Sequence, residues 1–162
     1  MGLRDRLRQG GSPEDWDALA ARVPYGRFLG IGIVPEGGGR FHTRLAFDEK
    51  LIGNTVLPAL HGGVIGAFLE TTAMFQVLVD AESEHLPKPV TLTVAYLRSA
   101  GPRDTYARAT ITKQGRRVVS VRVDAWQEDA EKPVATAQGQ FLLAADASGD
   151  EAVEPPHSTR SR

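Results

Sequence analysis

The sequence of 162 residues contains no cysteine. This absence excludes disulfide bonds, a thiolate nucleophile and zinc sites built on cysteine ligands. A chain of this length can still fold on its core alone, because a domain of about 150 residues buries roughly 70% of the surface of its unfolded chain. Hydrophobic residues make up 41% of the sequence, which is too large a fraction for a disordered protein. We therefore expect a globular domain without disulfides.

The chain also lacks an excess of charge of one sign, since 19 basic and 20 acidic residues leave a net charge of −1. Dedicated nucleic-acid binders usually have a strong basic excess, so this balance argues against that class. The charges are nevertheless unevenly distributed. Residues 98–122 contain seven basic residues and one acidic residue, whereas residues 123–162 contain three basic and eight acidic residues. The basic segment requires either an anionic partner or acidic neighbours within the fold.

Long hydrophobic runs are missing as well. The most apolar stretch, residues 62–79, is 18 residues long and includes Glu70 and Gln76. A membrane-spanning helix needs ~20 residues with few or no charges, so this stretch is predicted to be a buried helix. Residues 1–13 are rich in arginine and lack the apolar segment of a secretory signal. These features predict a cytoplasmic protein with no membrane partner.

Hydrophobic periodicity and turn residues predict an α+β fold. The pattern indicates a short helix over residues 13–22, two strands at 27–34 and 40–47, a loop over 48–60 and one long helix over 62–80. Four further strands are predicted at residues 90–97, 105–113, 117–127 and 133–143. Such an order predicts a six-stranded antiparallel sheet wrapped around the long helix. Residues 1–12 and 145–162 are expected to be loose ends.

Glu70 is the unusual residue of the long helix. Nearly every position from 64 to 79 is apolar or small, which is typical of a helix that is buried on most sides. Keeping a carboxylate ionised in such surroundings is costly unless it is paired with an opposite charge. An unpaired one would therefore need a functional reason. The structural alternative is that Glu70 faces a polar seam or pairs with an arginine from a strand.

The motif His61-Gly62-Gly63 comes immediately before this helix. The first N–H groups of a helix have no internal acceptor and carry the positive end of its dipole. Glycine lets a ligand oxygen approach such a backbone closely, which is what an oxyanion hole needs. The alternative is an ordinary helix start. Asn54, seven residues before His61, is able to bind a ligand or orient a water, or it is simply a turn residue.

Spacing along the helix links these residues to a dimer. Gly62 and Glu70 are eight positions apart, which is roughly 12 Å along the helix axis. One glutamate side chain does not easily span that distance. A carbonyl group held at Gly62 is therefore more easily reached by Glu70 of a second chain, whose long helix lies antiparallel to the first. This arrangement predicts a symmetric dimer with two composite sites.

The order Asn54, His61-Gly62-Gly63, Glu70 resembles the hot-dog-fold acyl-CoA thioesterases of the PaaI-like group, in the 4-hydroxybenzoyl-CoA thioesterase superfamily. Residues 90–100 and 113–117 are similar to the strand and the hairpin that follow the central helix in this family. The resemblance covers about residues 27–144. It leaves an N-terminal segment, 1–26, with one short helix, and a flexible acidic and polar tail, 145–162.

The resemblance implies a function and roles for the motif residues. In such enzymes the Gly62 N–H would hold the thioester carbonyl, and Glu70 of the partner subunit would act as general base or nucleophile. Asn54 would position the water or the thioester, while His61 would help to hold the loop and the ligand. The family commonly forms dimers that pair into tetramers. No metal and no cofactor are implied, apart from the coenzyme A moiety of the substrate.

Coenzyme A would be the anionic partner of the basic segment, because arginine binds phosphates in a bidentate manner. The candidate substrate-binding residues are Gly63, Arg98, Arg103, Arg116 and Arg117. The structural alternative is a solvated strand face whose arginines pair with nearby carboxylates. Other functions remain open at this point: a non-catalytic acyl-CoA-binding or sensor protein, an acyl-thioester dehydratase or hydratase, and a purely structural assembly domain.

Overall fold

The computed structural model of the protein describes residues 1–81 and 85–143. The tail predicted over residues 145–162 lies outside these residues. Six strands form one antiparallel sheet in the order β1-β2-β6-β7-β8-β5. They are β1 (Ile31–Gly37), β2 (Arg40–Leu45), β5 (Lys88–Tyr96), β6 (Thr105–Gln114), β7 (Val118–Trp126) and β8 (Ala135–Leu142).

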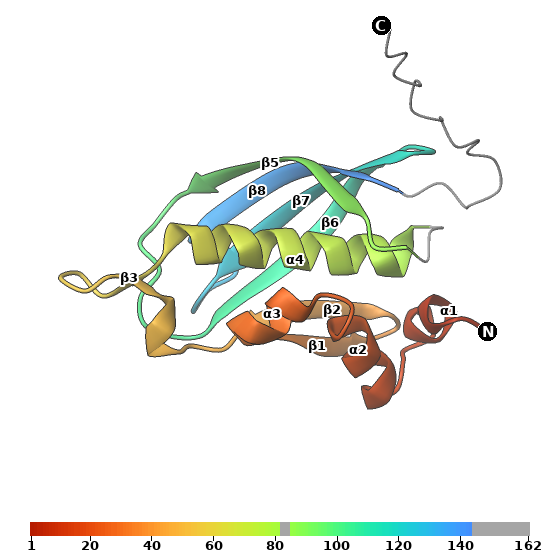
Figure 1. The fold of residues 1–162 in the computed structure, drawn as a ribbon, viewed down its shortest axis with the longest axis horizontal. Helices are drawn as coiled ribbons and strands as arrows, with labels where there is room; N and C mark the ends of the chain where they lie inside the picture. The colour runs from red at the N-terminus through yellow and green to blue at the C-terminus, as the bar shows by residue number, and fades with distance from the viewer. Residues whose placement is uncertain (82–84, 144–162) are drawn as a thin grey trace, which may run out of the picture.

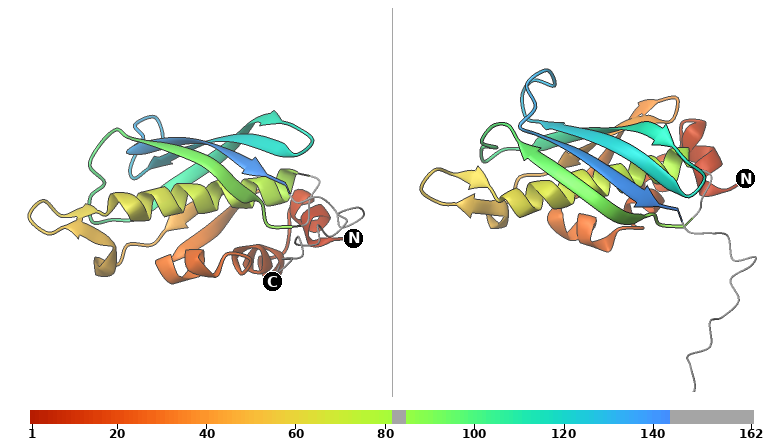
Figure 2. Two further views of the ribbon diagram at one scale, coloured as in Figure 1. Left: turned by 45° about the horizontal axis from the view of Figure 1, so that its top comes forward. Right: turned by 90° about the horizontal axis from the view of Figure 1, so that it is seen from above.

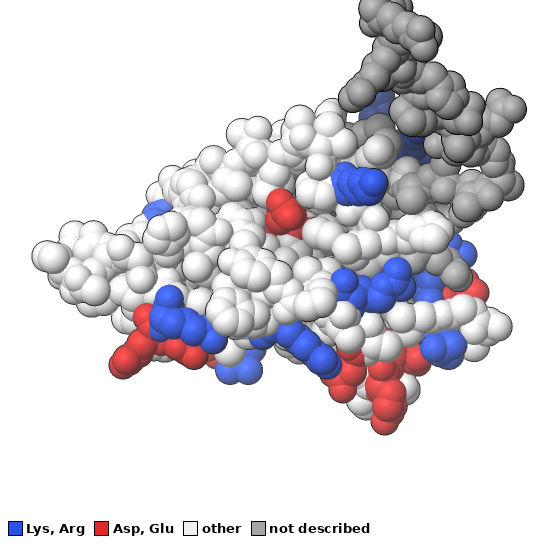
Figure 3. Space-filling view, in the orientation of Figure 1, with Lys and Arg blue, Asp and Glu red and all other residues white. Residues whose placement is uncertain are grey.

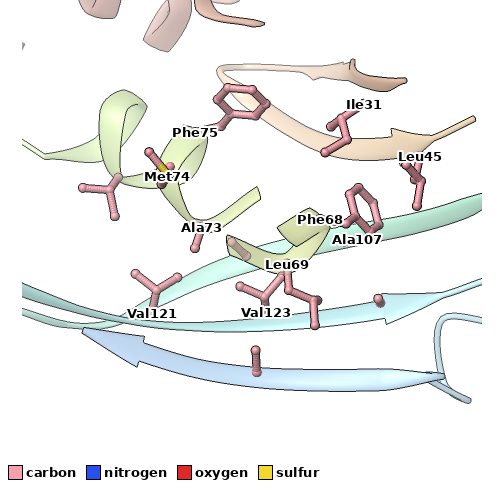
Figure 4. Packing of buried hydrophobic residues seen from close by; sticks show 14 of the residues in the cluster. Ile31, Leu45, Phe68, Leu69, Ala73, Met74, Phe75, Ala107, Val121 and Val123 are labelled. Atoms are coloured by element: carbon pink, nitrogen blue, oxygen red, sulfur yellow. The ribbon is translucent and has the colours of Figure 1, made fainter. Parts of the chain in front are cut away.

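The sheet curves around one long helix, α4 (Gly62–Asp80), as the sequence predicts (Figures 1 and 2). Large side chains of α4, such as Phe68, Leu69 and Phe75, fill the space between the helix and the sheet (Figure 4). The inner face of the central strands carries larger residues such as Val121 and Val123 together with several small ones. The small ones are Ala107, Ala109, Ala125, Ala135, Ala137 and Gly139. At these small residues the large side chains of the helix have room to pack against the sheet.

The mean hydropathy of α4 is 1.5, so the helix is long and apolar enough to cross a membrane by length and composition. In this fold it is the core helix, and 61% of its most apolar window is buried. The apolar character of α4 is therefore accounted for by the core of the protein.

Three short helices precede the sheet: α1 (Leu3–Arg8), α2 (Pro13–Ala20) and α3 (Pro24–Leu29). Ser12 caps α2, because its hydroxyl accepts the N–H of Asp15. The expectation that residues 1–12 are loose is wrong. Leu7 is buried, and Arg4 and Arg8 of α1 donate hydrogen bonds to the carbonyls of residues 79–81, where α4 ends. No N–H group of the helix donates to these last carbonyls, so two arginines from α1 donate hydrogen bonds to them.

Two segments before α4 differ from the prediction. The strand expected from residue 27 begins only at Ile31, because Pro24 starts α3 and Gly30, with a φ of 83°, ends it. The loop predicted over residues 48–60 has a structure of its own. It consists of the 3₁₀ turn η1 (Glu49–Leu51) and a ribbon of two short strands, β3 (Ile52–Asn54) and β4 (Ala59–Leu60), which projects beyond the start of α4 (Figure 1).

Strand β5 lies at the edge of the sheet and pairs only with β8 in the described part of the chain. Residues 89–97 carry no charge. The exposed fractions of Val90, Tyr96 and Leu97 are 59%, 56% and 50%. Soluble proteins usually protect such an edge with charges or prolines, or cover it.

Candidate active site at the start of helix α4

Within the described residues, the start of α4 leaves one backbone donor without an acceptor. The Gly63 N–H donates to Nδ1 of His61 at 2.9 Å, and the N–H groups of Val64 and Ile65 donate to the His61 carbonyl at 3.0 and 3.2 Å. Of the first four N–H groups of the helix, only that of Gly62 has no acceptor among residues 1–81 and 85–143. A free N–H at the positive end of a 19-residue helix is suited to hold an oxygen that gains negative charge.

His61 is held tightly in this arrangement. Its N–H donates to the Leu51 carbonyl at 2.8 Å, and Gly53 packs directly against it. A Cβ atom at Gly53 would lie 2.6 Å from the Cα of His61, so only glycine fits there. Because Nδ1 accepts a hydrogen bond, the neutral ring carries its proton on Nε2. This geometry suits a residue that holds the loop, the role implied by the family resemblance.

Glu70 lies two turns further along α4, on the same side as the helix start. A stripe of positions that are at least partly exposed, Gly63, Gly66, Ala67 and Glu70, connects the two. The Glu70 carboxylate has no hydrogen bond or ion pair with any residue that the structure describes. The alternative in which a strand arginine neutralises Glu70 is therefore not seen. A half-buried, unpartnered carboxylate is available for chemistry.

Asn54 has a structural role at the tip of the ribbon. Its Oδ1 accepts the N–H groups of Val56 and Leu57 at 3.0 and 3.2 Å, which shapes the turn between β3 and β4. The Nδ2 group has no partner in the described part of the chain. The turn role, one of the two alternatives that the sequence leaves open for Asn54, is therefore present in the structure. The ligand role of Asn54 stays a prediction.

A groove of about 420 Å³ lies between the start of α4 and the end of β5, and it is lined by Gly62, Tyr96 and Arg98 among others. A second groove of about 420 Å³ adjoins it, shares Arg98 and Ser99 with it, and reaches Arg103 and Lys132. Arg98 donates to the Pro133 carbonyl at 2.7 Å. Two of the four candidate arginines, Arg98 and Arg103, therefore lie along one path from Gly62.

The other two candidates, Arg116 and Arg117, lie elsewhere. They belong to the turn between β6 and β7, at the opposite end of the sheet from the start of α4 (Figure 1). Within one chain the structure does not bring them to Gly62.

Part of the basic segment, including Arg103, also has acidic neighbours. Arg103 pairs with Glu128, Arg108 with Glu36, and Arg122 with Asp124. Among residues 1–81 and 85–143, no group of three or more histidine, aspartate or glutamate residues is placed to bind a metal ion.

Sequence reasoning missed Tyr96 as a site residue. Its Oη donates to the Gly62 carbonyl at 2.8 Å, and its ring packs on the first turn of α4. The alternation of Leu92, Val94 and Tyr96 in the strand indicates that all three side chains face the helix, but it does not indicate which turn of the helix each one meets.

Comparison with known proteins agrees with this fold. The family model of the thioesterase superfamily matches residues 57–134, which include His61, Gly62 and Glu70. None of the curated proteins matches the chain. Among solved structures, a Chromobacterium violaceum protein is 36% identical over 88% of this chain and 93% of its own, with a TM-score of 0.67.

Two more distant structures show the same fold. The Escherichia coli PaaI protein of the phenylacetic acid degradation operon is 16% identical over 89% of this chain and 97% of its own, with a TM-score of 0.70. A Bacillus halodurans protein, whose structure contains CoA, is 19% identical over 84% of this chain and 97% of its own, with a TM-score of 0.68. The protein therefore belongs to the thioesterase superfamily and has its hot-dog fold.

Proposed function

We propose that this protein hydrolyses acyl-CoA thioesters to a free acid and coenzyme A. The observation that carries the proposal is the pair of unpartnered groups on one side of α4, the Gly62 N–H and the Glu70 carboxylate. The N–H and the helix dipole stabilise the oxyanion that forms on the thioester carbonyl. Glu70 removes a proton from water as the water oxygen bonds to the carbonyl carbon, or attacks that carbon itself. In the first route the C–S bond then breaks, and the departing thiolate takes up the proton from Glu70. In the second route the C–S bond breaks to leave a mixed anhydride on Glu70; water hydrolyses this anhydride to the free acid and Glu70, and the proton that the water releases goes to the thiolate.

The separation of the two groups, roughly 12 Å along the helix, is the reason to propose a composite site. The face that contains α4 and β5 has few charged side chains, whereas charges gather along the lower edge of Figure 3. Small residues at 63, 66 and 67 allow a second α4 to approach closely, and the free edge of β5 is able to pair with its copy. In such a two-fold dimer the partner subunit's Glu70 faces Gly62. Pairing of dimers into tetramers is proposed from the family resemblance alone.

The adjoining grooves would hold the coenzyme A moiety, with the thioester at Gly62 and the phosphates near Arg98 and Arg103. The CoA found with the Bacillus halodurans protein supports this class of ligand. Antiparallel pairing of β5 with its copy turns the far end of the partner's sheet toward this groove. Arg116 and Arg117 would therefore reach the phosphates from the partner subunit. We propose that hydrolysis needs no further cofactor, and that the enzyme works in the cytoplasm.

The direct test is the release of CoA from short, medium and aryl acyl-CoAs, detected by a thiol reagent. The protein contributes no background because it has no cysteine. Glu70→Gln should lower kcat by roughly 100-fold or more, because the neutral amide cannot accept the proton. Binding of a non-hydrolysable acyl-CoA ether should be unchanged. Glu14→Gln, on the exposed surface of α2, is the matched control and should keep full activity.

Two results would contradict the proposal. Full hydrolysis by the Glu70→Gln variant would remove Glu70 from the mechanism. Binding of the ether without release of CoA from any ester by the wild-type protein would indicate the non-catalytic binding function instead. A dehydratase is not supported, because His42 lies outside the site and pairs with Glu36 at 2.8 Å.

A further inference from the structure

We infer that Tyr96 is a positioning residue that fixes the direction of the Gly62 N–H. This inference rests on the proposed function. It starts from the two peptide units that flank Gly62, which together carry two carbonyl groups and two N–H groups.

Three of these four groups are bonded. The His61 carbonyl accepts from Val64 and Ile65, and the Gly63 N–H donates to the His61 ring. The Gly62 carbonyl accepts from the Tyr96 hydroxyl at 2.8 Å. The fourth group, the Gly62 N–H, is the one without an acceptor in the described parts of the chain. The peptide planes that determine its direction are therefore held from three sides.

Tyr96 is the contact that comes from the sheet. The other two contacts are local, since they link residues 61–65 to one another. A Cβ at Gly62 would lie 3.4 Å from the Tyr96 ring, and one at Gly66 would lie 3.7 Å from its hydroxyl. The ring thus rests on the first turn of α4, and the hydroxyl joins this turn to the edge strand β5.

The location on β5 gives the contact a second consequence. In the proposed dimer, β5 is the strand that pairs with its copy, so Tyr96 joins the oxyanion donor to the element that carries the partner. This contact would therefore keep the Gly62 N–H at a constant position relative to Glu70 of the partner subunit. Loss of the hydroxyl should let the helix start move relative to Glu70 of the partner subunit, which affects the transition state more than substrate binding.

The test compares Tyr96→Phe with Tyr106→Phe, which removes the same atom from a ring on the outer face of the sheet, near Trp126. Tyr96→Phe should lower kcat by roughly 5- to 10-fold, as expected for one hydrogen bond, with KM nearly unchanged. Amide hydrogen exchange at residues 63–65, whose N–H groups are hydrogen-bonded, should become faster in this variant. Tyr106→Phe should leave both quantities at the wild-type value.

The outcomes separate this inference from the proposed function. A wild-type enzyme that hydrolyses acyl-CoA, together with a Tyr96→Phe variant of unchanged kcat, overturns the role of Tyr96 alone. An effect on KM only would overturn it as well. Equal exchange at residues 63–65 in wild type and Tyr96→Phe overturns the role of Tyr96 as well, and this readout does not depend on activity. A wild-type protein that hydrolyses no ester refutes the proposed function itself.

Discussion

Gly62 is expected to act through a backbone N–H, so its role is tested by removing that one hydrogen. Proline lacks the N–H and is favoured at the first position of a helix. His61 has φ of −63° and ψ of 131°, the extended conformation that a residue before proline prefers. Gly62→Pro should therefore fold with a melting temperature close to that of the wild type, while its kcat falls by roughly 100- to 1,000-fold, the cost of losing one oxyanion-hole donor.

Gly62→Ala is the matched control, because it adds a Cβ but keeps the N–H. That Cβ would lie 3.4 Å from the Tyr96 ring, an ordinary contact. Its kcat should stay within a few-fold of the wild-type value. If the proline and alanine variants had the same kcat, the Gly62 N–H would not be the oxyanion donor.

Asp104 makes the stability depend on pH. The N–H of Phe47 donates to one carboxylate oxygen at 2.8 Å, and Arg44 contacts the other. The Phe47 N–H first, and then Arg44, hold the pKa of Asp104 below its ordinary value of about 3.9. The contribution of ionised Asp104 to the free energy of unfolding is therefore complete above the ordinary pKa. It is lost as the pH falls through the folded-state pKa.

Asp104→Asn removes this titration. Between pH 5 and pH 2, the free energy of unfolding of the wild type should fall more steeply than that of the variant, as measured by urea unfolding at each pH. Parallel pH curves for the two proteins would show that Asp104 does not have a lowered pKa.

At the scale of elements, the local sequence pattern was sufficient to predict α4 and the four strands that follow it. The helix bounds match, and each strand end lies within two residues of its predicted position. Alternation in a strand and apolar content in a helix are local properties, so one sequence reveals them. Helix α1 could not be predicted in this way, because it is held by contacts with residues 79–81, more than 70 positions away.

The arginines of α1 should stabilise α4 by capping its C-terminal carbonyls. Arg8 donates to the Val79 carbonyl at 2.8 Å and also to the carbonyl of Asp80. Arg8→Met should lower the free energy of unfolding by about 1–3 kcal/mol, because two charged hydrogen bonds at the negative end of the helix are lost. Denaturant unfolding measures this change.

Arg40→Met is the control for that experiment. Arg40 is an exposed residue of β2 whose side chain has no partner within the described residues. The stability of this variant should stay within about 0.5 kcal/mol of the wild type. An equal loss in both variants would mean that capping by Arg8 adds nothing beyond a general effect of charge.

At the scale of the whole molecule, the sequence identified the motif residues but could not arrange all of them. Gly62 and Glu70 lie on one helix, so their separation followed from helix geometry. Arg98 and Arg116 are both in the basic segment, yet they lie at opposite ends of the sheet, and only the order of the strands shows this. The contact of Tyr96 with Gly62 likewise joins residues 34 positions apart.

The central claim is that each active site combines Gly62 of one subunit with Glu70 of the other. The most direct test mixes two inactive variants, Gly62→Pro and Glu70→Gln, after unfolding and refolding them together. In a mixed dimer one site has both defects and the other has none. The composite site predicts recovery of about a quarter of the wild-type kcat per chain, because half of the randomly formed dimers are mixed and each has one intact site. If every site used residues of a single chain, each chain would still carry a defect, and the refolded mixture would stay as inactive as the separate variants.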